Sequence, residues 1–143
     1  MKFLSPLIVV SNIEKSKQFY NEVLGLKVVN DFGANVTLTG GIALQTKDTW
    51  SAFIQKKDSE IILGGNAAEL YFEEEDFDGF IQRINDIEDI NYVHYLLEHS
   101  WGQRVIRFYD PDKHIIEVGE SLECVVRGFL KYGMTVEQVA ELI

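Results

Sequence analysis

Residues 7–25 read LIVVSNIEKSKQFYNEVLG and decide the fold, because they place a short strand directly before a capped helix. The first four residues form an apolar, β-branched run, and Asn12 supplies a side chain that can cap a helix N-terminus. Apolar residues then recur at helical spacing up to Leu24, and Gly25 can adopt the left-handed conformation that ends a helix. The stretch predicts a strand over 7–10 and a helix over 13–24.

Three β-prone runs follow at residues 26–32, 35–39 and 42–46, separated by Gly33-Ala34 and Gly40-Gly41, which are typical of hairpin turns. The first half therefore has the order βαβββ. The same order returns in the second half, with a strand over 70–74, a helix capped by Asp76, and strands over 91–98, 103–109 and 114–119. A shift of 64 positions lays Ser5 on Glu69 and Asn12 on Asp76.

The sequence predicts one α+β domain over residues 1–120, with half-repeats at about 3–46 and 68–120 and a connector at 47–67. Residues 121–143 form a helical C-terminal extension: apolar residues from Leu122 to Leu130 precede a break at Gly133, and Thr135 then opens a last short helix. We expect this apolar tail to pack against another surface.

Composition excludes several classes of function. The formal charge of −10 and the pI near 4.7 argue against nucleic-acid binding, which needs clustered Lys and Arg, and favour cationic partners. The single cysteine, Cys124, cannot form an intrachain disulfide, and residues 1–11 lack a signal-peptide pattern, so we expect a cytoplasmic protein. No apolar run approaches the roughly 18 to 20 residues that cross a bilayer, so we expect no membrane partner.

Several short motifs occur in a characteristic order. They are Phe19-Tyr20, Val23-Leu24-Gly25-Leu26, Trp101-Gly102-Gln103-Arg104, Tyr109-Asp110-Pro111-Asp112 and Ile116-Glu117-Val118. Each is weak alone, since Asp-Pro-Asp is also a common turn. Together with the half-repeat, their order and spacing make the chain resemble the vicinal-oxygen-chelate superfamily, which includes glyoxalases, bleomycin resistance proteins and extradiol dioxygenases, over residues 3–120.

The resemblance implies that each βαβββ module forms a curled mixed sheet, with its helix outside and a concave pocket within. Members that use a divalent metal ion hold it with two His and one or two carboxylates. Carried over one at a time, these ligand positions fall on Ser5, Gln45, Glu69 and Glu117. Of the four, only Glu117 is the residue that the family pattern leads us to expect.

This donor set contains no imidazole. Zn²⁺ and Ni²⁺ favour nitrogen or sulfur ligands, whereas oxygen ligands suit Mn²⁺, Mg²⁺ or Ca²⁺. The sequence therefore favours a site without a bound metal. The alternative is a divalent ion held by oxygen ligands. Without a metal, two inward carboxylates need another counter-charge, because an unpaired buried carboxylate is costly. Strand alternation makes Arg107 that counter-charge, although a solvated place at the rim is an equal alternative.

Other residues could line the pocket. Alternation directs Gln103, Arg107 and Tyr109 toward it, and Trp101 could either stack on a ligand or pack across its hairpin. His94 and His99 do not match family ligand positions, so structural or surface roles are favoured over acid, base or ligand roles.

Two hypotheses follow. The first is a binding protein that sequesters a cationic or aromatic small molecule in an acidic pocket. The alternative is a metal-dependent lyase, isomerase or dioxygenase of the superfamily, in which Glu117 or Glu69 moves a proton. The resemblance implies a homodimer under either hypothesis.

Overall fold

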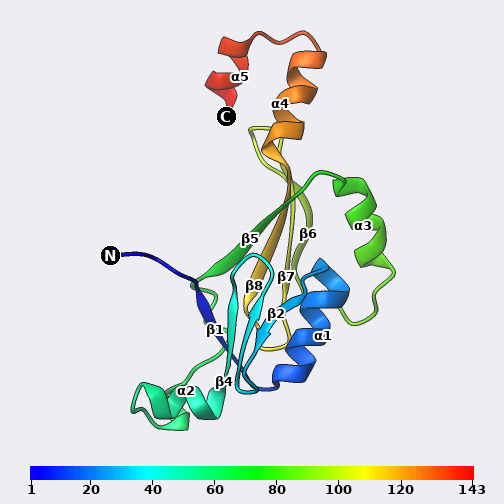
Figure 1. Ribbon diagram of the computed structural model, residues 1–143. Coiled ribbons are helices and arrows are strands. Elements are labelled where there is room, and N and C mark those ends of the chain that lie inside the picture. Colours follow the sequence, from blue (N-terminus) through cyan, green and yellow to red (C-terminus); the bar gives the residue numbers. More distant parts are fainter. The chain divides into compact units, whose positions relative to one another are not determined.

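The computed structural model describes residues 1–143, which divide into two compact units. The first unit contains Met1–Gly65 together with Asp110–His114, and the second contains Asn66–Tyr109 and Ile115–Ile143. Each unit has its own sheet and helices (Figure 1). No helix has the length and apolar character needed to span a membrane.

The first unit is built on a four-stranded sheet in the order β1-β4-β3-β2. Strand β1 runs parallel to β4, while the β4–β3 and β3–β2 pairs are antiparallel. The elements of this unit are β1 (Leu7–Val10), α1 (Ile13–Leu24), β2 (Val28–Asp31), β3 (Asn35–Leu38), β4 (Ala43–Thr46), α2 (Lys47–Phe53) and the short 3-10 helix η1 (Asp58–Glu60).

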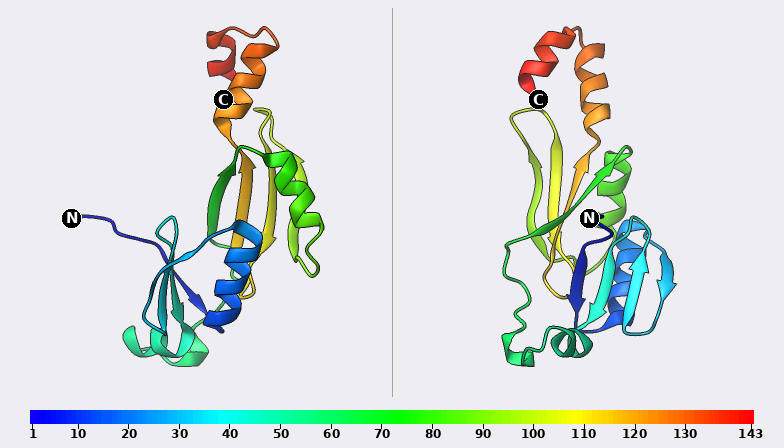
Figure 2. Two further views of the ribbon diagram at one scale, coloured as in Figure 1. Left: turned by 45° about the vertical axis from the view of Figure 1, so that its right-hand side comes forward. Right: turned by 60° about the vertical axis from the view of Figure 1, so that its left-hand side comes forward.

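The second unit repeats this plan with the sheet order β5-β8-β7-β6, in which β5 runs parallel to β8. Helix α3 lies against one face of the sheet (Figures 1 and 2), and two further helices follow the last strand. The elements are β5 (Glu69–Glu74), α3 (Phe77–Asn85), β6 (Tyr92–Glu98), β7 (Arg104–Tyr109), β8 (Ile115–Glu120), α4 (Leu122–Lys131) and α5 (Val136–Leu142). The predicted α+β fold with two βαβββ half-repeats and a helical tail is confirmed, and neither sheet closes into a barrel.

Helix boundaries follow the predicted caps. The Asn12 side chain accepts a hydrogen bond from the backbone N–H of Lys15 at 3.0 Å, and Asp76 accepts one from Gly79 at 3.1 Å. At the other end of α1, Gly25 has φ of 68°, and the N–H of Leu26 donates to the carbonyl of Tyr20 at 3.0 Å. Leu26 thus belongs to the helix end, and β2 begins at Val28, later than predicted.

The Asp-Pro-Asp turn explains a second shift of boundary. Asp110 accepts hydrogen bonds from the backbone N–H groups of Asp112 and His114, and Lys113 has a positive φ of 66°. These contacts hold His114 in the turn, so the last strand starts at Ile115 and continues to Glu120. Asp110 also accepts from the hydroxyl of the fully buried Tyr20 at 2.8 Å, which joins this turn to α1 within the first unit.

The core of the second unit lies between its sheet and α3. Strand side chains of one parity are fully or almost fully buried, and α3 contributes three buried apolar residues to the same layer. These residues are Ile106, Phe108, Ile116 and Val118 from the sheet, and Phe77, Phe80 and Ile84 from the helix. The opposite parity of β5, β7 and β8 is therefore directed away from α3.

Candidate functional site

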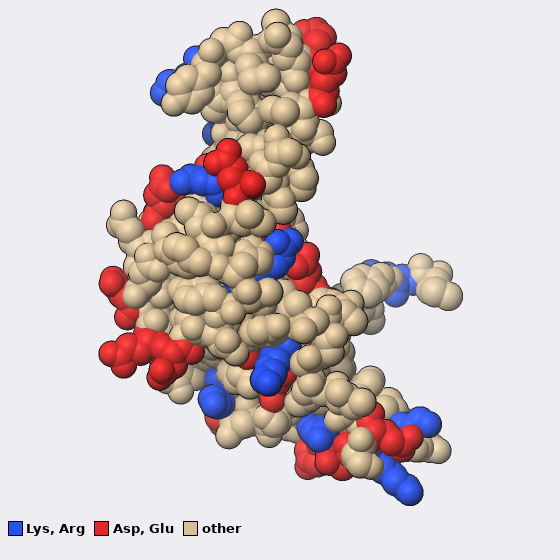
Figure 3. Space-filling model, turned by 180° about the vertical axis from the view of Figure 1, so that it is seen from behind, with Lys and Arg blue, Asp and Glu red and all other residues tan.

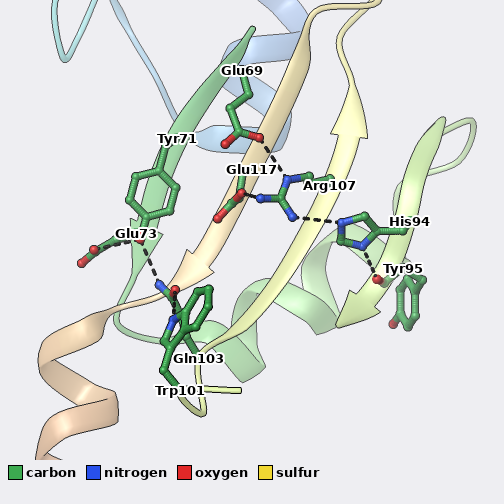
Figure 4. A network of polar contacts seen from close by, with 9 residues as sticks. All are labelled: Glu69, Tyr71, Glu73, His94, Tyr95, Trp101, Gln103, Arg107 and Glu117. Atoms are coloured by element: carbon green, nitrogen blue, oxygen red, sulfur yellow. Dashed lines mark hydrogen bonds and ion pairs between the residues drawn. The ribbon is translucent and has the colours of Figure 1, made fainter. Parts of the chain in front are cut away.

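The candidate site lies on the side of the second sheet that faces away from α3, which we call the open face. It is defined by Glu69, Tyr71, Glu73, His94, Gln103, Arg107 and Glu117, all labelled in Figure 4. Strand register explains why they meet: Glu117 on the central strand β8 is paired with Tyr71 on β5 and with Arg107 on β7. Residues that pair across neighbouring strands present their side chains on the same face.

Arg107 is the centre of this face. Its Nε donates to a carboxylate oxygen of Glu69 at 3.0 Å, and its Nη2 forms an ion pair with Oε2 of Glu117. Its Nη1 lies 3.1 Å from Nε2 of His94. Figure 4 shows the guanidinium between these three side chains, which come from three different strands. Arg107 therefore lies between the two carboxylates for which strand alternation predicts it as the counter-charge, and the imidazole of His94 joins them.

The contacts of His94 define its tautomer. A guanidinium can only donate hydrogen bonds, so Nε2 of His94 must be the acceptor. The proton then resides on Nδ1, which donates to the carbonyl of Tyr95 at 2.8 Å. The imidazole therefore serves as a neutral acceptor for Arg107.

Burial makes the charge pairing important. The side chain of Glu117 is only 6% exposed, whereas that of Glu69 is 39% exposed. A buried carboxylate loses its hydration and needs a partner, and the Arg107 guanidinium provides it. Of the two acids, Glu117 therefore depends more strongly on Arg107.

A second set of polar contacts runs along the same face. The indole N–H of Trp101 donates to Gln103 at 3.1 Å, and the Gln103 amide donates to the hydroxyl of Tyr71 at 2.9 Å. Tyr71 in turn donates to Glu73 at 2.9 Å. Partial burial, reinforced by Glu73, raises the pKa of the Tyr71 phenol, while the hydrogen bond from Gln103 opposes this shift. Tyr71 therefore presents a neutral hydroxyl near neutral pH.

Trp101 lies in the hairpin between β6 and β7, where it stacks on His99 with ring centroids 4.2 Å apart. This stacking covers one face of the indole and explains the position of the His99 ring. The hydroxyl of Tyr109 donates to Asn66 at 2.7 Å, at the start of the second unit. Tyr109 is thus tied to the segment that leads into β5.

The remaining family ligand positions lie in the first unit. Ser5 is exposed and precedes β1, while Gln45 on β4 is 2% exposed. The Gln45 amide is fully engaged: its oxygen accepts from Asn35 at 2.8 Å and its nitrogen donates to Thr49 at 2.6 Å. Gln45 therefore connects two strands and α2 within its own unit.

These donors do not fit a divalent metal ion. No three His, Cys, Asp or Glu side chains are grouped so that they could hold a metal. Glu69 and Glu117 are both paired with the same guanidinium, and the Gln45 amide is used within the protein. A metal ion would have to displace a fixed cation from its two carboxylates, so we derive no chemical step through a metal.

Sequence reasoning missed three residues of the open face. Tyr71 and Glu73 share the parity of Glu69 on β5, so the alternation that found Arg107 could also have found them. His94 could not be found in that way, because the register between β6 and β7 shifts between Tyr92 and His94. Such a bulge changes the face to which the following side chains point.

Arg104 has the opposite parity to Arg107 on β7. Its guanidinium binds Glu120 with two hydrogen bonds of 3.0 Å and contacts Asp78 on α3 at 2.7 Å. The hydrogen bonds to Glu120 raise the pKa of Arg104 above its ordinary value, with a smaller contribution from Asp78. Arg104 therefore belongs to the helix side of the sheet and takes no part in the open face.

Residues 3–123 match the family of glyoxalase-like domains. A solved protein of unknown function from Agrobacterium tumefaciens is 39% identical over 85% of this chain and 94% of its own, with a TM-score of 0.74. A glyoxalase/bleomycin resistance protein/dioxygenase from Nocardioides is 17% identical over 84% and 83% of the two chains, with a TM-score of 0.68. A lactoylglutathione lyase from the same Agrobacterium species is 21% identical over 85% and 95%, with a TM-score of 0.65. At these lower identities the likeness shows the fold alone.

No curated protein matches the chain.

Proposed function

This chain belongs to the glyoxalase-like domain family, within the vicinal-oxygen-chelate superfamily, and we propose that it binds a small cationic or aromatic molecule on the open face without a metal. One observation carries the proposal. The face presents three carboxylates, Glu69, Glu73 and Glu117, against one guanidinium, Arg107, and it also presents Tyr71 (Figure 4).

Charge and an exposed aromatic ring support this class of ligand. Glu117 and Arg107 neutralise each other, so Glu69 and Glu73 leave the face with an excess of negative charge. A cation near an aromatic ring gains from the negative face of the π-system, and Tyr71 is 48% exposed beside Glu73. A flat cation would therefore gain from both features. The metal-dependent enzyme has no comparable support, because the donors do not fit the ion.

Isothermal titration calorimetry tests the proposal with three probes of similar size: N-methylquinolinium as the cation, quinoline as the neutral ring and 2-naphthalenesulfonate as the anion. We expect the cation to bind most tightly at pH 8 and to bind less tightly as salt is added. Glu73→Gln keeps a hydrogen-bond acceptor for Tyr71 but removes the charge. It should weaken cation binding about five-fold, equivalent to ~1 kcal/mol.

The matched control is Glu88→Gln, which removes an exposed carboxylate from the turn after α3 and should leave binding unchanged. Preference for the sulfonate, or equal losses in both variants, would contradict a cation site on the open face. Failure of all three probes to bind would remove the support for an aromatic ligand.

Two further parts of the proposal concern the protein's setting. We propose a cytoplasmic protein, because Cys124 is a free, half-buried thiol that suits a reducing compartment. We also propose a homodimer, which is supported by the exposed apolar residues of the helical tail, including Leu130, Val136 and Ile143.

A further inference from the structure

The three partners of the Arg107 guanidinium are all side chains of the kinds that bind metals. They are two carboxylates, Glu69 and Glu117, and the imidazole of His94. Each is contacted by a different nitrogen of the same guanidinium, so the guanidinium lies among all three (Figure 4). Two carboxylates and one imidazole are ligand types that suit divalent transition-metal ions, but here they are spread around the guanidinium and are not grouped closely enough to hold a metal while Arg107 lies between them.

The lone pair of His94 also points in the required direction. Nδ1–H donates to the carbonyl of Tyr95, so the lone pair with which a neutral imidazole could coordinate a metal is on Nε2, where it accepts from Arg107. A second hydrogen bond from the other ring nitrogen is what orients histidine ligands in metal sites. The only positive charge at this point is the guanidinium.

We propose that Arg107 takes the place of a divalent cation on the open face, so that the chain supplies an internal cation and thereby prevents metal binding by Glu69, His94 and Glu117. The family ligand positions include the two carboxylates but not His94. The inference goes beyond the proposed ligand-binding function, because it concerns the ligand-free protein.

Competition is the physical basis of this exclusion. The guanidinium and a metal ion would need the same carboxylate oxygens, and the ion pair of Glu117 is buried. A metal would have to break that pair and move a second positive charge next to the first, which is unfavourable at short range. Removal of the guanidinium reverses the situation, because two carboxylates are left without a counter-charge and a cation is then favoured.

The experiment measures the binding of Mn²⁺ to the protein by equilibrium dialysis and by the loss of the electron paramagnetic resonance signal of the free ion. The wild-type protein should retain no stoichiometric Mn²⁺. Arg107→Ala should gain affinity by about ten-fold or more. Arg107→Lys, which keeps a positive charge between the acids, should behave like the wild type. Adding Glu117→Gln to Arg107→Ala should abolish the gain.

Each result decides the matter. Stoichiometric Mn²⁺ in the wild type that is lost in Glu117→Gln would overturn the proposal, and this result needs no Arg107 variant. A folded Arg107→Ala protein that gains no affinity would overturn it as well, with folding checked by circular dichroism. Because no organic ligand is used, failure here is distinguishable from failure of the proposed function.

Discussion

Gly102 is a residue at which one added methyl group should be harmful for two reasons. It adopts φ of +80°, and a Cβ atom there would lie 2.4 Å from Cζ of Phe129 on α4. We predict that Gly102→Ala lowers the free energy of unfolding by about 2–3 kcal/mol, through backbone strain and a steric clash together. Urea denaturation followed by circular dichroism measures the loss.

Gly133→Ala separates these two causes. Gly133 also has a positive φ, +96°, but no atom lies within 4 Å of the position of its Cβ. This variant should lose only the part due to strain, about 1 kcal/mol. Equal losses in the two variants would show that Phe129 moves aside without cost.

Tyr20 should make the stability of the first unit sensitive to alkali. Complete burial, followed by the charge and hydrogen bond of Asp110, raises the pKa of its phenol above the ordinary value near 10. The unfolded chain therefore loses this proton first as pH rises. The contribution of Tyr20 to the free energy of unfolding is complete below pH ~10. Above that pH the free energy of unfolding should fall by up to ~1.4 kcal/mol per pH unit, until the phenol of the folded form also ionises.

Thermal unfolding between pH 8 and 11 measures this effect. Tyr20→Phe should be less stable at pH 8, since Asp110 loses a donor, but its alkaline decline should be shallower. Tyr132→Phe is the control, because Tyr132 is 89% exposed. A decline of the same slope in Tyr20→Phe and the wild type would contradict the assignment.

At the scale of elements, helix α5 depends on its N-terminal cap. The Thr135 hydroxyl accepts from the N–H of Gln138 at 3.2 Å, and the Gln138 side chain accepts from the N–H of Thr135 at 2.8 Å. Thr135→Ala removes half of this capping box and should cost about 1 kcal/mol. Hydrogen exchange should then become faster across residues 136–142, whereas Glu141→Ala, which leaves the cap intact, should not accelerate it.

The order of elements could be predicted from sequence because it depends on local chemistry. Asn12, Gly25 and Asp76 mark helix ends by hydrogen bonds and conformations that span only a few residues. The pairing of Arg107 with Glu117 could also be predicted, since it needs only the alternation of two neighbouring strands. Both predictions required no knowledge of distant contacts.

The rest of the open face depends on long-range register. His94 reaches Arg107 only because β6 is irregular between Tyr92 and His94, and no residue in that stretch signals a bulge. Likewise, Trp101 could equally have lined a pocket or packed in its hairpin, and the outcome depended on the position of His99. Pattern alone does not determine such contacts.

At the scale of the molecule, the apolar tail lacks a full covering. Helices α4 and α5 enclose a groove of about 320 Å³ lined by Val126, Leu130, Val136, Val139, Ala140 and Ile143. Val136 is 68% exposed and Ile143 is 51% exposed. In Figure 3 the tail, at the top, is largely neutral on its near side, with acidic side chains along one edge. Exposed apolar surface of this kind favours association.

We therefore predict a dimer in sedimentation velocity and assign its contact to the tail. Leu130→Lys combined with Val136→Lys places two charges in the groove and should shift the protein to monomer, since an interface core tolerates unpaired charge poorly. Phe53→Lys changes a residue that is 70% exposed on α2 and should leave the dimer intact. If Phe53→Lys alone dissociates the dimer, the contact involves the first unit instead, and the apolar groove must serve another purpose.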